Sequence, residues 1–216
     1  MAKLYFRYGT VGSAKTLNLL AVAHNYRQQN KKILLLKPVI DDRFGANNIT
    51  SRAGLTMTAD HLLYSYSTFK YNGELLCDEP QQAKEKSTII QITSQDPLSC
   101  LIVDEAQFLH KRIINQLHLI SIYADIPVIL YGLRTNFRGE LFSGTKRILE
   151  LADTIEEVKT TCYYCNKKAT HNLKFVNNKP NITGPDIELG ADEKYKPTCK
   201  YCYFEKTRTI DSLESF

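Results

Sequence analysis

Short apolar segments alternate with longer amphipathic segments along residues 1–158 of the chain. Short apolar runs predict buried strands, and apolar positions that recur every three to four residues predict helices. The predicted strands are 3–8, 32–37, 101–103 and 127–131. The predicted helices are roughly 16–29, 111–123 and 145–151. Strands that alternate with helices indicate an α/β fold, in which helices cover both faces of a parallel sheet.

Other stretches carry weaker signals. Residues 39–58 are polar and predict a loop, and the stretch that follows to Thr93 fits neither period clearly. Near Lys159 both periods give way to a segment rich in Tyr, Asn, Lys and Cys. We therefore expect two domains, 1–158 and 159–216.

The composition is that of an ordinary folded protein. Of the 216 residues, 43% are hydrophobic and 24% are charged, so the chain can bury a core and is not expected to be disordered. It has no run of 18 apolar residues, which argues against a membrane-spanning helix. The first residues lack the apolar core of a signal peptide. We therefore expect a cytoplasmic protein with no membrane partner.

The net charge of +5 comes from residues 159–209, where ten Lys and Arg face five Asp and Glu, while the other eighteen of each sign cancel. A basic excess can favour nucleic acid or another anion such as phosphate. A solvated basic surface explains an excess this small more simply.

A segment typical of nucleotide-binding proteins follows the first predicted strand. The P-loop pattern is Gly-x4-Gly-Lys-Ser/Thr between a strand and a helix. Here the segment runs Gly9, Thr10, Val11, Gly12, Ser13, Ala14, Lys15 and Thr16, with alanine at the second glycine. Backbone N–H groups of residues 11–16 would bind phosphate, Lys15 would neutralise it and Thr16 would hold Mg²⁺. Alanine disfavours positive φ, so we expect Gly12 to relax the loop. A plain strand–turn–helix connection is the alternative.

Two acids follow the apolar strand at 101–103. In P-loop folds a strand-end acid supports Mg²⁺, usually through water, and this is the role expected for Asp104. Glu105 could then accept a proton from a hydroxyl or water nucleophile. A solvated strand end is the simpler alternative, but the preceding P-loop favours the functional interpretation.

Four of the six cysteines form two CxxC pairs, Cys162 with Cys165 and Cys199 with Cys202. Without a secretion signal, this pattern predicts a structural zinc site of four thiolates, with no open position for catalysis. A redox pair or four unrelated thiols is the alternative. The 33 residues between the pairs exceed the usual spacing, so this insert should form a structure of its own. Cys77 and Cys100 have no partner motif, and Cys100 is expected to be buried.

These motifs occur together, in the same order, in one known family. Asp104-Glu105-Ala106-Gln107-Phe108 resembles the Asp-Glu-x-Gln-Phe signature of type II thymidine kinases. The other shared segments are the glycine loop, 40–43, 131–139, both cysteine pairs and 190–195. The resemblance covers nearly the whole chain, and bacterial members look most similar. It implies a P-loop (RecA-like) domain and a small C-terminal zinc-ribbon domain with a lasso loop.

The resemblance also implies an activity, the ATP-dependent phosphorylation of the 5′-hydroxyl of thymidine or deoxyuridine. It makes Glu105 the acceptor of the hydroxyl proton and places Lys15 and Arg43 at the transferred phosphoryl group. It adds Asp41, Asp104 and Gln107 to the residues of the glycine loop that bind ATP and Mg²⁺. It further implies a homotetramer that is inhibited by thymidine triphosphate bound in the nucleoside site.

By the same resemblance, four residues wall the thymine pocket. They are Phe108, Leu133, Phe137 and Phe142, and ordinary core packing is the alternative for each. A lasso of about residues 177–195, fixed at both ends by zinc, would close over the nucleoside. Its backbone would contact the base at Ile187, Glu188, Leu189 and Gly190. Tyr195 would pack on the sugar and base or hydrogen-bond near them, or it would simply anchor the loop.

Two other classes of function match parts of the chain. The first is a P-loop ATPase that acts on nucleic acid through a zinc-ribbon tail. It is suggested by Asp-Glu-Ala-Gln, which resembles the Walker B motif of helicases. Such motors generally need a second core domain, for which this chain has no room. The second is a non-catalytic zinc ribbon that binds nucleic acid through aromatic and basic residues. Its aromatic candidates are Tyr163, Tyr164, Tyr201, Tyr203 and Phe204. We expect no nucleic-acid partner.

Overall fold

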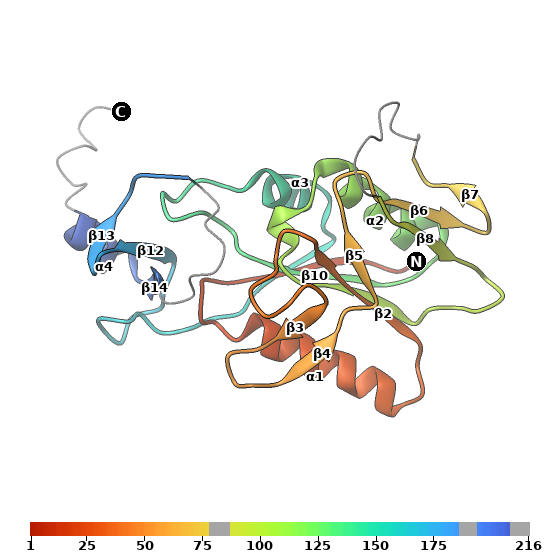
Figure 1. Ribbon diagram of the computed structural model, residues 1–216, viewed down its shortest axis with the longest axis horizontal. Coiled ribbons are helices and arrows are strands. Elements are labelled where there is room, and N and C mark those ends of the chain that lie inside the picture. Colours follow the sequence, from red (N-terminus) through yellow and green to blue (C-terminus); the bar gives the residue numbers. More distant parts are fainter. Residues whose placement is uncertain (78–86, 186–193, 208–216) are drawn as a thin grey trace.

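The computed structural model describes residues 1–77, 87–185 and 194–207. Its centre is a six-stranded parallel sheet with the strand order β11-β1-β10-β9-β2-β5 (Figure 1). The strands are β1 (Leu4–Tyr8), β2 (Ile33–Pro38), β5 (His61–Leu63), β9 (Cys100–Val103), β10 (Val128–Gly132) and β11 (Thr154–Glu157). Because all six run in the same direction, their carboxyl ends meet at one edge, where a ligand site is expected.

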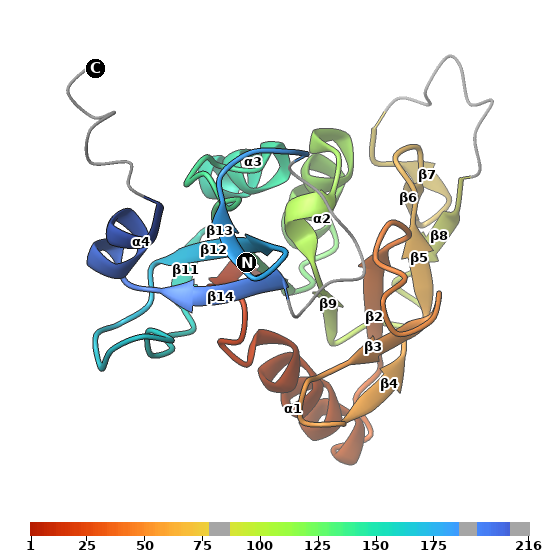
Figure 2. The ribbon, with the colours of Figure 1, turned by 60° about the vertical axis from the view of Figure 1, so that its left-hand side comes forward.

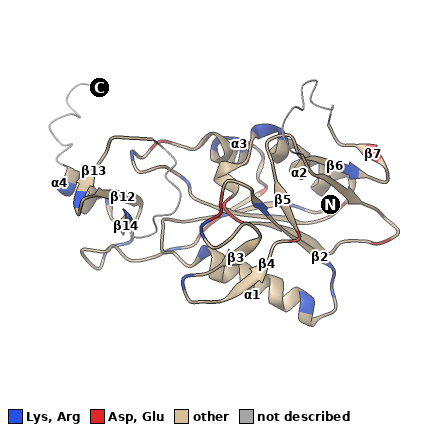
Figure 3. Cartoon of the chain, viewed as in Figure 1, with Lys and Arg blue, Asp and Glu red and all other residues tan. Residues whose placement is uncertain are grey.

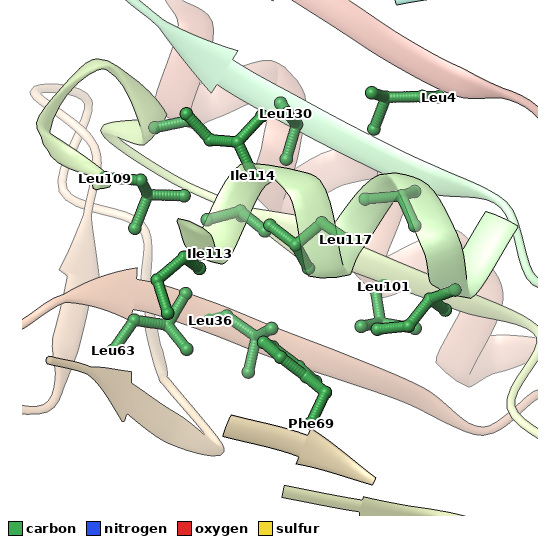
Figure 4. Packing of buried hydrophobic residues seen from close by; sticks show 14 of the residues in the cluster. Leu4, Leu36, Leu63, Phe69, Leu101, Leu109, Ile113, Ile114, Leu117 and Leu130 are labelled. Atoms are coloured by element: carbon green, nitrogen blue, oxygen red, sulfur yellow. The ribbon is translucent and has the colours of Figure 1, made fainter. Parts of the chain in front are cut away.

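Helices cover both faces of this sheet, as predicted. On one face, α1 (Lys15–Gln28) packs through Leu19 and Leu20 against Leu35 and Ile102. On the other face lie α2 (Lys111–Tyr123) and α3 (Ser143–Leu151). Figure 4 shows how α2 lays its apolar side chains on the strands below it. Side chains alternate between the faces of a strand, so the continuous apolar run of β9 serves both cores.

The structure contains short strands where the sequence predicted a loop or no clear element. Within 39–58, β3 (Asn48–Thr50) and β4 (Thr56–Thr58) form an antiparallel pair, so the loop prediction was wrong there. Only Ile49 of this pair is buried, which explains why no apolar period revealed it. Further along, β6 (Thr68–Tyr71), β7 (Glu74–Leu75) and β8 (Ile89–Ile92) form a separate three-stranded sheet.

The C-terminal part is built on a second three-stranded sheet, at the end of the molecule opposite β6, β7 and β8 (Figures 1 and 2). Its elements are β12 (His171–Val176), β13 (Lys179–Asn181), β14 (Tyr195–Thr198) and α4 (Lys200–Thr207). Asn177 and Asn178 take φ of 50° and 58°, which suits a two-residue hairpin turn. The first part of the predicted lasso is therefore a hairpin and not a loop.

Several predictions for the C-terminal part lie outside what the structure describes. Ile187, Glu188, Leu189 and Gly190 belong to residues 186–193, which are not among the described residues. The division into 1–158 and 159–216 stays a prediction, and position 159 comes two residues after the end of β11. None of the helices in the described part of the chain has the length and apolar content needed to cross a membrane.

Leu117 tests the packing of α2 on the sheet. Its side chain is fully buried in the cluster beneath the helix. We expect Leu117→Ala to lower the free energy of unfolding by about 2–5 kcal/mol, because it leaves a cavity in a closely packed core. The control on the same helix is Ile122→Ala, whose side chain is 37% exposed. Urea titration should show a clearly smaller loss for this control, and equal losses would contradict the packing.

Candidate active site

A cavity of about 430 Å³ opens at the carboxyl edge of the central sheet. It brings together residues that lie far apart in the sequence. Those predicted from the sequence are Val11, Gly12, Ser13, Ala14, Lys15, Thr16, Arg43, Glu105, Phe108, Leu133, Phe137, Phe142 and Tyr195. Five other predicted residues, Gly9, Thr10, Asp41, Asp104 and Gln107, are not among its lining residues. The cavity thus has a phosphate-loop side and an aromatic side.

The backbone of the glycine loop differs in one respect from the expectation. Gly12 takes φ of 70°, as expected, but Ala14 also takes a left-handed φ of 63°. The expectation that alanine would avoid this conformation was wrong, and the strain is of the order of 1–2 kcal/mol. Gly9 has a different reason to be glycine, because a Cβ there would lie 2.5 Å from the Val158 carbonyl oxygen.

Lys15 folds back over the loop. Its buried ammonium group donates to the Thr10 carbonyl oxygen at 2.8 Å. Burial lowers the pKa of Lys15 below its ordinary value, and the nearby carboxylates of Glu105 and Asp104 counteract only part of this effect. The position suits a cation that meets an anionic ligand at the N-terminus of α1.

Two of the N–H groups expected to bind phosphate already have partners. The Ser13 N–H donates to the Thr10 carbonyl oxygen at 3.3 Å. The Val11 N–H donates to the Asn172 Oδ1 atom at 2.8 Å. The convergence of the N–H groups of residues 11–16 on phosphate stays a prediction, and in this structure two of these groups are directed to protein acceptors.

Asp104, at the end of β9, lies directly behind Thr16. The Thr16 hydroxyl donates to the Asp104 Oδ2 atom at 3.1 Å. Burial and the adjacent Glu105 carboxylate raise the pKa of Asp104 above its ordinary value. A hydroxyl and a carboxylate oxygen are the ligand types that Mg²⁺ prefers, so these two residues fit a magnesium site.

Glu105 is a buried carboxylate with two donors. Its Oε1 atom accepts from the Arg43 guanidinium at 2.5 Å, and its Oε2 atom accepts from the Gln107 side-chain amide. Burial alone would raise the pKa of Glu105, but the positive charges of Arg43 and Lys15 outweigh it and hold this pKa below its ordinary value. In Figure 3, acidic and basic segments adjoin at the centre of the view, near β3. Glu105 therefore lines the cavity as a carboxylate whose ionised form is favoured.

Arg43 is held between two carboxylates. Its Nε atom donates to the Asp41 Oδ1 atom at 2.6 Å, while its Nη2 atom reaches Glu105. The Asp41 Oδ2 atom lies 3.2 Å from the ammonium of the fully buried Lys37. Asp41 thus lies behind Arg43 and orients it, since a paired guanidinium has little rotational freedom.

Gln107 lies in a short 3₁₀ helix, η1 (Ala106–Phe108), and is 1% exposed. Its Nε2 group donates to Glu105, and its Oε1 atom accepts from the Leu133 N–H at 3.0 Å. A Cβ on Gly132 would lie 2.7 Å from this Oε1 atom and 3.2 Å from the Gln107 backbone nitrogen, so a larger residue there would displace the Gln107 side chain. Although Gln107 was predicted at the cofactor site, the structure places it behind Glu105, where it fixes the carboxylate.

Aromatic side chains form the other side of the cavity. The rings of Phe108 and Phe142 meet edge to face with centroids 5.7 Å apart. The Phe137 and Tyr195 rings lie 6.5 Å apart, and Leu133 lines the same space. Surfaces of this kind suit a flat, partly apolar ligand such as a nucleobase.

The four cysteines of the CxxC pairs gather at one point, with all Sγ atoms within 4.8 Å of one another. Two of these distances are 3.7 Å, from Cys165 to Cys199, and 3.8 Å, from Cys165 to Cys202. They are too long for disulfides. A tetrahedral ion with Zn–S bonds of about 2.3 Å would place its sulfurs about 3.8 Å apart. The cluster therefore fits a four-thiolate zinc site.

Other residues of the cavity wall were not predicted. These are Leu17, Phe44, Thr50, Ser51, Arg52, Ala53, Thr135, Asn136 and Asn172. Phe44 directly follows Arg43, a predicted site residue, so its position in the sequence could have indicated that it lies at the cavity. Arg52 lies in the β3–β4 hairpin, which had no apolar period. Asn172 lies on β12, 161 positions after its partner Val11, and no local pattern could have indicated that contact.

Comparisons with known proteins agree on one family. The family model described as "Thymidine kinase" matches residues 2–203. The thymidine kinase of Lactobacillus acidophilus is 38% identical over 204 residues, which is 94% of this chain and 97% of that protein. The thymidine kinase of Lactococcus lactis subsp. lactis is 38% identical over 205 residues, which is 95% of this chain and 98% of that protein. The chain therefore belongs to the thymidine kinase family, as its motifs predicted.

Proposed function

We propose that the protein transfers the terminal phosphoryl group of ATP to the 5′-hydroxyl of thymidine and of deoxyuridine, as a step of deoxynucleoside salvage. The observation that carries this proposal is a single cavity lined by the phosphate loop, Glu105 and an aromatic wall. Direct transfer requires donor and acceptor to meet at one point, and this cavity offers such a point. Family membership disfavours both the nucleic-acid motor and the non-catalytic binding module.

Lys15 and the N-terminus of α1 would bind the donor phosphates. Thr16 and Asp104 would hold Mg²⁺, which neutralises developing charge on the phosphates when bound. Arg43 lines the same cavity and contacts both Asp41 and Glu105. Since the transition state of phosphoryl transfer spreads negative charge over the moving group, a guanidinium at that place would stabilise it.

Glu105 would accept the proton of the attacking hydroxyl. Each carboxylate oxygen can accept two hydrogen bonds, so a substrate hydroxyl can bind without displacing Arg43 or Gln107. A sugar hydroxyl is too weak an acid to ionise beforehand. The carboxylate would therefore orient the hydroxyl and take its proton as the new P–O bond forms.

The aromatic side of the cavity would hold the base, with Phe108, Phe137, Phe142 and Tyr195 around it. Residues 177–195 would cover the nucleoside, and zinc on the four cysteines would fix both ends of this segment. A homotetramer and inhibition by thymidine triphosphate at the nucleoside site belong to the same proposal. So does the cytoplasm as the place of action.

The role of Glu105 can be tested with Glu105→Gln, which keeps the shape of the side chain but cannot accept the proton. We expect kcat to fall about 10²–10⁴-fold while the affinity for thymidine changes little. Formation of thymidine monophosphate from thymidine, ATP and Mg²⁺ gives kcat, and calorimetry gives the affinity. Glu150→Gln, on the exposed side of α3, is the control. Equal turnover in wild type and Glu105→Gln would remove Glu105 from proton transfer.

The electrostatic role of Arg43 gives a separate prediction. Glu105 acts as a base only when ionised, so activity is lost as the pH falls through its pKa. Arg43→Met removes the cation that lowers this pKa and leaves the effect of burial. We expect the acidic limb of kcat/KM against pH to move upward by about 1–3 pH units. Arg147→Met, which removes an exposed ion pair, should leave the limb in place. An unchanged acidic limb in Arg43→Met would contradict the role of Arg43 in lowering the pKa of Glu105.

Zinc removal tests the anchoring of the C-terminal part. A chelator should weaken thymidine binding, because the segment between the cysteine pairs then loses its fixed ends. Calorimetry on metal-free protein, with the metal content measured, checks this prediction. Restored affinity after zinc is added back is the control, and unchanged affinity in protein shown to be metal-free would contradict the anchoring.

A further inference from the structure

The C-terminal part of the chain contacts the phosphate loop through one side chain. Asn172, on β12, is 4% exposed and lies between two backbone groups of the central domain. Its Oδ1 atom accepts from the Val11 N–H at 2.8 Å, and its Nδ2 atom donates to the Thr135 carbonyl oxygen at 3.1 Å. The amide therefore joins the phosphate loop to the loop after β10.

This contact has only one satisfactory orientation. Rotating the amide by 180° would set an NH₂ group against the Val11 N–H and an oxygen against the Thr135 carbonyl. A buried polar group without a partner costs about 1–3 kcal/mol, so Asn172 holds Val11 at a defined place. The neighbouring Gly12 lies close to the same part of the chain, since a Cβ there would come within 3.9 Å of Pro197 on β14.

Asn172 is in turn positioned by the cysteine cluster. In the β12–β14 pairing, Asn172 lies opposite Pro197, and His171 lies opposite Thr198. Thr198 is followed directly by Cys199, one of the four clustered cysteines. The path from the cysteine cluster to the phosphate loop therefore consists of one strand pair and one side-chain amide.

The same part of the chain is also held against the loop after β10. The Tyr203 hydroxyl donates to the Phe137 carbonyl oxygen, and Arg134 donates to the Thr170 carbonyl oxygen at 3.5 Å. Together with the Asn172 bond to Thr135, these contacts hold the C-terminal part of the chain against the loop after β10 at three places. A displacement of β12 would therefore move the attachment of Val11 and not merely a surface loop.

We infer that Asn172 is a positioning residue that links the conformation of the four-cysteine domain to the conformation of the phosphate loop. Through this link the domain sets the affinity for the phosphate donor. The inference rests on the proposed function, which assigns the donor to this loop. The expected coupling is reciprocal, because two sites linked through one element affect each other's affinity equally. Zinc on the cysteines would thus strengthen donor binding as well as nucleoside binding.

Asn172→Leu tests the inference, since leucine has a similar volume and makes no hydrogen bond. Without thymidine, we expect the Kd of a non-hydrolysable ATP analogue with Mg²⁺ to rise about fivefold to tenfold. At saturating ATP and thymidine, kcat should change less than the KM for ATP. The amide proton of Val11, followed by NMR hydrogen exchange, should lose its protection. The control is Thr170→Val, which removes a contact to the His171 ring on the same side of the domain and should bind the analogue as wild type does.

Equal analogue affinity and a protected Val11 amide in folded Asn172→Leu would overturn the inference. If this variant does not fold, zinc-depleted wild type replaces it. Faster exchange at Val11 and weaker analogue binding would then support the inference, and unchanged values in metal-free protein would overturn it. A wild type that fails to phosphorylate thymidine would refute the proposed function instead, because the exchange of Val11 does not depend on turnover.

Discussion

Glu105 is a largely buried carboxylate that faces two cations, and these cations favour its charged form. Removing a carboxylate from water favours its neutral form, and the charges of Arg43 and Lys15, with the hydrogen bond from Gln107, reverse that preference. Asp41 and Lys37 extend the network behind Arg43, and Gln107 fixes the second carboxylate oxygen. The proposed chemistry depends on this balance, because a neutral Glu105 could not take a proton.

The parallel sheet explains why these groups meet. Glu105 follows the end of β9, the glycine loop follows β1, and the loop that carries Leu133 and Phe137 follows β10. These strands are neighbours in the sheet, so their carboxyl ends deliver all three loops to one place. Glu105 takes a left-handed φ of 48°, and backbone strain of this kind often occurs at functional sites. The Asn172 contact adds β12 to this arrangement, and the pairing of β12 with β14 joins the cysteine cluster to the glycine loop.

Sequence reasoning was most successful where the chemistry lies within a few consecutive residues. The glycine loop, Asp104-Glu105 and the cysteine pairs are contiguous motifs, and α2 was predicted with its observed bounds because its apolar period is regular. It failed at Ala14, whose backbone is held by the surrounding loop against its own preference. It also missed Arg52 and Asn172, because short polar strands have no apolar period and a contact over 161 positions leaves no local pattern.

The central claim is that Glu105 is ionised in the buried site, and its own titration tests this claim most directly. NMR of protein with ¹³C-labelled glutamate carboxyl groups follows this group, with Glu105→Gln identifying its signal. The account predicts a pKa below the value of about 4.3 for a free glutamate side chain, with Arg43 and Lys15 as the cause. A pKa well above that value would show that burial outweighs the two cations, and the proposed base would then be neutral over part of the working pH range.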